Sequence, residues 1–232
     1  MITRANKLLL LLAGLLLLGS CNKVTYVYSD SYIMYYAIHD GIEIWTNKNK
    51  LGQHLLEVRL KKPFKSVSYD SKGEDKIIYD DLCKKHNDLS YCREVTFYNG
   101  VGGDGASYPD YTSVSITCNS NYDEEHPAGT PLNDIIICEY CSSYLYVLGG
   151  YADESLLGTK IKPLIEVTPE DLMLQARLVF FFTQNPDTPG RHDITVSVTT
   201  DDGRTFTATC TMDFNEENLK NLDNFSYDNY RK

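Results

Sequence analysis

The chain has 232 residues, and its 32 aspartates and glutamates outnumber its 22 lysines and arginines, which gives a formal charge of −10 at pH 7. A surface this acidic is repelled by nucleic acid and by anionic lipid headgroups, so we exclude nucleic acid as a partner. The length is sufficient for one large β domain or two small ones.

The N-terminus has the pattern of an export signal. Two cationic residues precede an apolar run over residues 8–18, which is too short to span a bilayer and has the length of a signal-peptide core. The run ends in LGSC at residues 18–21, which resembles the lipobox of bacterial lipoproteins. The resemblance implies a signal peptide over residues 1–20 and lipid on the Cys21 thiol, where two or more acyl chains anchor stably. A plain secretory signal with an incidental cysteine is the alternative.

Residues 21–109 are predicted to form a β-rich N-terminal region, either as extra strands on the main core or as a small second domain. Residues 76–87 are predicted to be a short helix, and the glycine-rich GVGGDG at residues 100–105 is the candidate hinge to the next region. Runs of β-branched and aromatic residues favour short strands at residues 24–28, 31–39, 43–45, 55–60 and 66–69.

Residues 110–215 are predicted to form a β-sandwich region. In residues 112–118 apolar and polar side chains alternate, which predicts a strand with one buried face. Residues 174–183 are a continuous apolar run, which indicates a strand buried on both faces in the middle of a sheet. Thr168, followed by Pro169 and two acids, is typical of a helix start. Further candidate strands are residues 132–140 and 144–148.

The clearest pattern is a hairpin over residues 193–214. Apolar residues alternate with threonine and serine on both of its strands, so one face is expected to be buried and the other exposed. Asp202 and Gly203 between the strands are expected to supply the positive φ angles of a tight turn. Residues 216–232 are polar and are expected to form a short helix or a loose tail.

Short strands separated by frequent turns are typical of a sandwich or a barrel. We therefore predict a mostly β fold, an immunoglobulin-like β-sandwich with an N-terminal β-rich extension or small second domain.

Six cysteines remain once Cys21 carries lipid, and an even number in an exported chain favours disulfides. Buried thiols, a metal site and a redox site are the alternatives. The CxxC at residues 138–141 follows a predicted strand, whereas a redox CxxC needs a helix start. The expected pairs are Cys83 with Cys92 and Cys118 with Cys210, while Cys138 and Cys141 either pair or stay reduced.

The stretch NSNYDEEHPAGTPLND at residues 119–134 carries a dense group of ionisable side chains. Asp123, Glu124 and His126 are candidate ligands for zinc or calcium, or candidate groups for acid/base catalysis. Consecutive residues rarely converge on one ion, and no H-E-x-x-H motif is present, so we favour a solvated connection between strands.

This stretch, together with the later DITVSVTTDDGRTFTAT, is similar to a group of uncharacterised lipoproteins from Bacteroidota. The similarity covers about residues 113–214 of this chain. It implies an envelope lipoprotein with a β-rich body, and it assigns no activity and no catalytic residue.

Eighteen tyrosines accompany a single tryptophan. Exposed aromatic side chains can stack on sugar rings and peptides. Tyrosines that only line strands and sheet edges are the alternative, which we favour. Five of them crowd the first predicted strands, at Tyr26, Tyr28, Tyr32, Tyr35 and Tyr36.

No nucleophile elbow, phosphate-binding loop or spaced metal motif is found in the sequence, so we expect no enzymatic activity and no cofactor. The leading hypothesis is a lipid-anchored protein of the cell envelope, in the outer membrane and facing the periplasm or the surface. Its role would be non-catalytic binding, adhesion or assembly with an envelope partner. The alternatives are a metal-dependent extracytoplasmic hydrolase that uses Asp123, Glu124 or His126, and a glycan-binding accessory lipoprotein.

Overall fold

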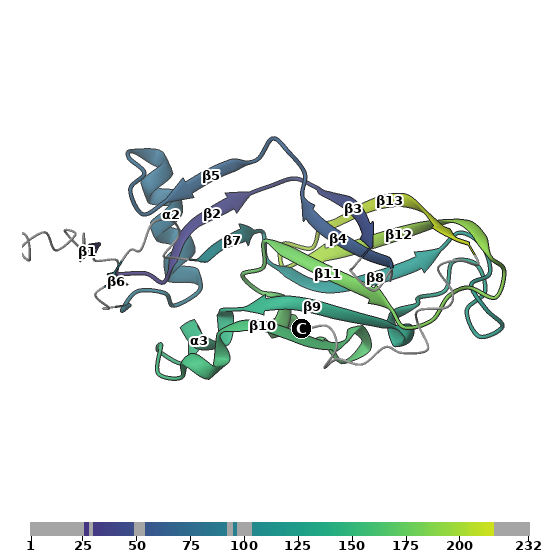
Figure 1. Ribbon diagram of the computed structural model, residues 1–232. Coiled ribbons are helices and arrows are strands. Elements are labelled where there is room, and N and C mark those ends of the chain that lie inside the picture. The colour runs from purple at the N-terminus through teal and green to yellow at the C-terminus, as the bar shows by residue number, and fades with distance from the viewer. Residues whose placement is uncertain (1–25, 28–29, 49–53, 92–94, 97–103, 216–232) are drawn as a thin grey trace, which may run out of the picture.

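The computed structural model describes residues 26–27, 30–48, 54–91, 95–96 and 104–215, and the fold is mostly β, as predicted (Figure 1). The described strands form two larger sheets that share one core and a smaller sheet with its own core. A two-stranded ribbon is made by β1 (Tyr26–Val27) and β6 (Val95–Thr96).

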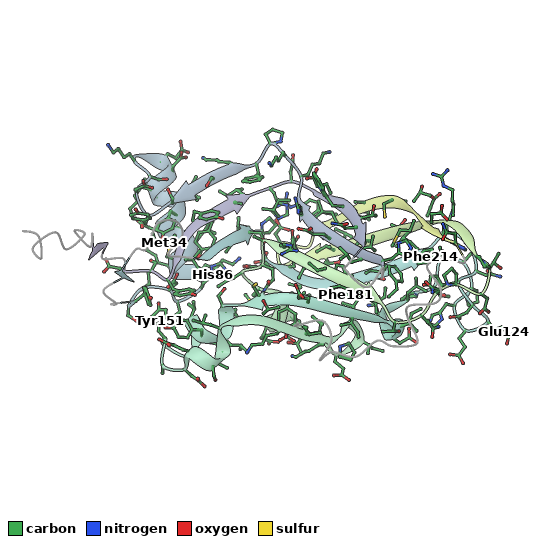
Figure 2. The ribbon with its side chains drawn as sticks, in the orientation of Figure 1. Met34, His86, Glu124, Tyr151, Phe181 and Phe214 are labelled. Carbon is green, nitrogen blue, oxygen red and sulfur yellow. The ribbon has the colours of Figure 1, made fainter. Side chains whose placement is uncertain are left out.

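The largest sheet has five antiparallel strands in the order β10-β9-β11-β4-β3. Its central strand is the apolar run that was expected to be buried on both faces, and every residue from Leu178 to Phe182 is buried. On the face away from the shared core, Ile137, Val179 and Phe181 (Figure 2) form a separate apolar cluster. The strands are β3 (Ile42–Lys48), β4 (His54–Leu60), β9 (Ile136–Ser142), β10 (Gly158–Pro163) and β11 (Arg177–Phe182).

The second sheet has three antiparallel strands in the order β13-β12-β8 and contains the predicted hairpin. Alternate residues along β12 are buried, which confirms the expected alternation. The turn between the two strands differs from the expected tight turn. Gly203 has a positive φ of 84°, but Asp202 does not. The Thr200 N–H donates to the Arg204 carbonyl at 2.9 Å, which closes a longer loop. The strands are β8 (Tyr111–Cys118), β12 (Gly190–Thr200) and β13 (Thr205–Phe214).

These two sheets face each other, and the inward side chains of both fill a single core. Aromatic rings from three segments meet within it. The Phe182 ring centroid lies 6.0 Å from that of Tyr122 and 5.6 Å from that of Phe214. Complete burial of such side chains stabilises the fold by roughly 1.5–3 kcal/mol each.

A smaller sheet in the order β5-β2-β7 is covered on one face by helix α2. Strand β2 pairs antiparallel with β5 and parallel with β7. Tyr36 is fully buried and packs against Tyr79 of the helix, whereas Tyr35 points to the other face because successive residues of a strand alternate. The elements are β2 (Ile33–Ile38), β5 (Lys65–Ser68), α2 (Glu74–Lys85) and β7 (Asp104–Tyr108).

A buried ionic cluster ties this smaller unit to the larger sheets. The Asp110 carboxylate accepts hydrogen bonds from His86 Nε2 at 2.7 Å and Lys85 Nζ at 2.9 Å, both at the end of α2 (His86 in Figure 2). It also accepts from the Leu174 N–H at 3.2 Å, and Asp201 of the β12–β13 turn binds Lys85 and the Asp110 N–H. Burial raises the pKa of Asp110, but the hydrogen bond from His86 and the charge of Lys85 outweigh it, so the pKa lies below its ordinary value.

Strands from both sides of residue 109 share the main core. β3 and β4 come from the predicted N-terminal region, yet they belong to the five-stranded sheet and pack on the main core. They are extra strands on the same core, which was one of the two alternatives. β2, β5, β7 and α2 form the smaller core instead. The proposed hinge at residues 100–105 lies mostly outside the described residues, and the tail at residues 216–232 lies wholly outside them.

One predicted strand is a helix. Residues 144–148 form the helix α3 (Tyr144–Leu148). The prediction was wrong because a short apolar run does not distinguish a strand from a helix. The helix stops at Gly149 and Gly150, and the φ of Gly150 is 66°. This pair of glycines was the readable signal for a helix end.

The two predicted helices are present. Residues 76–87 correspond to α2, and Thr168 caps α4 (Pro169–Leu172) through reciprocal hydrogen bonds with Asp171. Short 3-10 turns occupy Asn133–Ile135, Glu154–Leu156 and Leu164–Glu166.

Candidate functional site

The acidic loop is held together by its own side chains. The Asp123 carboxylate accepts hydrogen bonds from the N–H groups of Glu125 and His126, at 2.9 and 2.8 Å, and lies 2.7 Å from His126 Nδ1. On the other side of the ring, His126 Nε2 lies 3.0 Å from Asp134 Oδ1. Burial lowers the pKa of His126, but hydrogen bonds to the two carboxylates outweigh it and raise the pKa above its ordinary value.

This geometry makes the loop a connection between strands. Each ring nitrogen of His126 lies within hydrogen-bond distance of a carboxylate oxygen, Nδ1 of Asp123 and Nε2 of Asp134. Glu124 is exposed at the outer end of the molecule (Figure 2). Among the described residues, no group of three or more His, Cys, Asp or Glu side chains could hold a metal ion. Of the candidate residues, Asp123 and His126 are joined by hydrogen bonds, and Glu124 is exposed beside them.

The expected disulfide between sheets is not possible in this fold. Cys118 and Cys210 pair with Ile194 from opposite sides, so they lie in one sheet with β12 between them. Two strand spacings are about 9.6 Å, whereas the Cα atoms of a disulfide are about 4.4–6.8 Å apart.

The CxxC cysteines do not pair either. Cys138 and Cys141 are three positions apart on β9, so their side chains point to opposite faces, Cys138 into the core and Cys141 to the surface. Cys83 is also a free thiol, and Cys92 lies outside the described residues.

The tyrosines of the first strands separate into two kinds. Tyr36 is buried, and Tyr32 packs edge-on against two further tyrosine rings, so these two serve packing as we favoured. Tyr35 is 41 % exposed. The side chains of Tyr26 and Tyr28 lie outside the described residues.

A groove of about 580 Å³ lies where the smaller sheet meets β3 and β4. Three exposed aromatic side chains line it from separate segments: Tyr35 of β2, Trp45 of β3 and Phe64 of the β4–β5 connection. Trp45 is 53 % exposed and Phe64 is 37 % exposed. Exposed apolar side chains gathered in a hollow indicate a binding surface, whereas scattered ones need no explanation.

Two neighbours fix the tryptophan ring. Trp45 Nε1 donates to Glu43 Oε1 at 3.0 Å, and the Arg59 guanidinium carbon lies 4.7 Å from the ring centroid. A cation–π contact of this kind contributes about 0.5–1 kcal/mol at an exposed site. Because Ile42 and Ile44 of the same strand point into the core, the indole is presented outward on a firmly held strand.

A paired ionic group forms the polar floor of the groove. Glu57 accepts a bidentate pair of hydrogen bonds from Arg59, at 2.6 and 2.9 Å, and its Oε1 also lies 2.6 Å from Arg177 Nε. The register of β4 and β11 places the two arginines directly opposite each other. The hydrogen bond from Arg59 lowers the pKa of Glu57, so the carboxylate stays ionised at neutral pH. Each guanidinium has five N–H donors, and both side chains are about half exposed, so donors remain for a ligand.

A glycine sets the position of the Tyr35 ring. Tyr35 and Gly105 are register partners on the parallel strands β2 and β7. A Cβ atom at residue 105 would lie 2.0 Å from Tyr35 Cζ, so the ring rests directly on the glycine. A glycine in a strand often marks such a close approach.

A second hollow of about 190 Å³ shares Ala176 and Arg177 with the groove. Its wall is fixed because the buried Gln175 side chain pairs with the backbone of Cys141. Gln175 Nε2 donates to the Cys141 carbonyl at 2.5 Å, and Oε1 accepts from the Cys141 N–H at 3.2 Å. We call the two hollows together the linked groove.

The lining of the linked groove combines aromatic and charged side chains. It offers stacking surfaces and fixed hydrogen-bond donors, and its Glu57 carboxylate is already paired with two guanidinium groups and is not available as a base. Nothing in the sequence patterns above singled out Trp45, Arg59 or Arg177. One feature of the sequence could have indicated this site: the only tryptophan of the chain lies on the polar side of an alternating strand, beside Glu43.

No protein-family model matches the chain, and no curated protein or solved structure matches it. The similarity to Bacteroidota lipoproteins therefore stays a prediction. So does lipidation of Cys21, which lies outside the described residues. Within the described ranges, the helices are all too short or too polar to cross a membrane.

Proposed function

We propose that the protein is a lipid-anchored, non-catalytic binding protein of the cell envelope, tethered to the outer membrane through Cys21, and that it holds its partner in the linked groove. The observation that carries this proposal is the convergence of Tyr35, Trp45 and Phe64, from three separate segments, beside the Arg59–Glu57–Arg177 group. Aromatic and arginine side chains are the types that contribute most binding energy at protein surfaces.

We propose an immunoglobulin-like β-sandwich as the body that carries the groove. Two antiparallel sheets around one core support this class of fold. Sites built on strands are held more firmly than sites on loops. The groove is lined mainly by strand residues, and this favours a ligand recognised without a large rearrangement.

Binding is favoured over the hydrolase alternative by the state of the ionisable groups. Asp123 and His126 are engaged with each other, and Asp134 takes the second nitrogen of the ring. Glu124 is exposed, and among the described residues it does not join Asp123 and His126 in a group of three that could hold a metal ion.

The anchor and the groove can be tested in the same cells. Cys21→Ala is expected to abolish incorporation of a labelled fatty acid into the protein. A photocrosslinking amino acid at residue 35 is expected to capture an envelope component, and the same amino acid at residue 69 is the control.

Tyr69 suits this comparison because it is 36 % exposed, close to the value for Tyr35, and does not line the groove. The captured product should be lost when Trp45→Ala is added. Equal crosslinking from residues 35 and 69, insensitive to Trp45→Ala, would contradict a binding role for the groove.

A further inference from the structure

We propose that the ligand of the linked groove is a carbohydrate chain that lies across β3, β4, β11 and β9, stacks on Trp45 and Tyr35, and hydrogen-bonds to Arg59 and Arg177. This inference rests on the proposed binding function and names the class of its ligand.

The shape of the site favours a chain-like ligand. The two hollows meet at Ala176 and Arg177 and continue from β3 to β9 over four neighbouring strands. Three strand spacings correspond to about 14 Å. A depression of this length suits several linked rings, and both of its ends are lined by side chains held in place, by Glu43 and Arg59 at one end and by Gln175 at the other.

The chemistry of the lining favours sugar rings. A pyranose presents an apolar C–H face, which stacks on an aromatic ring, and hydroxyl groups at its rim, which bind planar polar side chains. The groove supplies both kinds of surface side by side, because Trp45 rests against the Arg59 guanidinium, which is itself fixed by Glu57.

The hydration of the charged side chains in the groove also favours a carbohydrate ligand. Glu57, Arg59 and Arg177 carry full charges, and covering half-exposed guanidinium groups with an apolar ligand would leave N–H donors without partners. Sugar hydroxyls can replace the water molecules on these donors one for one. A ligand rich in hydroxyl groups therefore covers the floor at least cost.

An extended peptide fits less well. The linked groove crosses the strands on a face of the sheet, so a peptide lying in it could not add a strand to an open edge, and its backbone N–H and C=O groups would depend on side chains alone.

The sole tryptophan makes the test direct. Because Trp45 is the only tryptophan of the chain, its fluorescence reports on the groove and on nothing else. The full chain, purified in detergent, is screened on a broad array of neutral and acidic oligosaccharides. Hexasaccharides chosen from that array are then titrated while Trp45 emission is recorded. We expect a saturable change in emission for at least one of them.

Variants separate stacking from a general surface effect. Tyr35→Ala is expected to weaken binding about three- to tenfold, the range for loss of one aromatic contact, and Arg177→Gln to weaken it at least threefold. The matched control Tyr69→Ala is expected to leave the affinity within twofold. Unchanged circular dichroism shows that each variant is folded, and calorimetry confirms the affinities of Trp45→Ala, which lacks the fluorophore.

Failure of this inference can be told apart from failure of the proposed function. If no oligosaccharide on the array changes Trp45 emission, or if affinity survives both Tyr35→Ala and Arg177→Gln, the carbohydrate assignment is overturned. If residue 35 nevertheless crosslinks to an envelope protein in a Trp45-dependent manner, the groove binds a protein and the proposed function stands without the carbohydrate. If residue 35 captures nothing above the residue 69 control, both are overturned.

Discussion

Replacing Asp110 by asparagine removes the charge at the centre of the ionic cluster while keeping the shape of the side chain. The carboxylate is fully buried and holds His86 and Lys85 at 2.7 and 2.9 Å. Loss of hydrogen bonds to a buried charged acceptor costs about 1.5–3 kcal/mol. The loss falls mainly on the buried His86, because Lys85 is partly exposed and keeps Asp201 as its partner. With about 2–4 °C lost per kcal/mol in a chain of this size, even a cost of about 1.5 kcal/mol corresponds to a fall in Tm of about 3–6 °C.

The free energy of unfolding, from urea titration followed by circular dichroism, measures the effect. Asp201→Asn is the matched control, because Asp201 shares Lys85 but is partly exposed, and it is expected to cost only about 1 kcal/mol. The pKa of Asp110 is lowered in the folded state, so its stabilisation is present above its unfolded pKa and is lost as the pH falls through the folded value. A cost for Asp110→Asn no larger than that of Asp201→Asn at pH 7 would refute the structural role of the cluster.

Three further predictions concern the loop, the groove and the thiols. The pKa of His126 is raised by folding, so the stability difference between the wild type and His126→Gln should be largest below about pH 6.5 and should shrink as the pH rises; a difference that grows with pH in urea titrations would contradict the paired imidazolium. Gly105→Ala should push the Tyr35 ring out of place and weaken groove binding as much as Tyr35→Ala does, and full retention of affinity in the Trp45 titration would show that the ring position is unimportant. Maleimide labelling followed by peptide mapping should modify the exposed Cys141 before Cys138, whose thiol is buried with a raised pKa; the reverse order would mean that β9 faces the other way.

Local patterns of the sequence predicted much of the fold. The alternating threonines of β12 and β13, the continuous apolar run of β11 and the Thr168 cap each depend on neighbours within a few positions, and each is present. For these elements the buried face or the helix start is specified by the segment itself.

Features that depend on distant segments could not be predicted in this way. A boundary at residue 109 looked natural in the sequence, yet Asp110 lies in the ionic cluster that joins the two parts, and β4 pairs with β11. The expected bridge between Cys118 and Cys210 is ruled out because both strands belong to one sheet. The groove was missed because Tyr35, Trp45 and Phe64 meet only once two sheets are in place.

The pairing of β4 with β11 has a consequence for the export that we propose. More than a hundred residues separate the two strands, so a chain that leaves the cytoplasm N-terminus first exposes the apolar side of β4 long before β11 has crossed. Slow, non-local pairing of this kind leaves strands open to aggregation. If the chain is exported and lipidated as we propose, we expect it to need a holding chaperone in the periplasm until residues up to Phe182 have emerged.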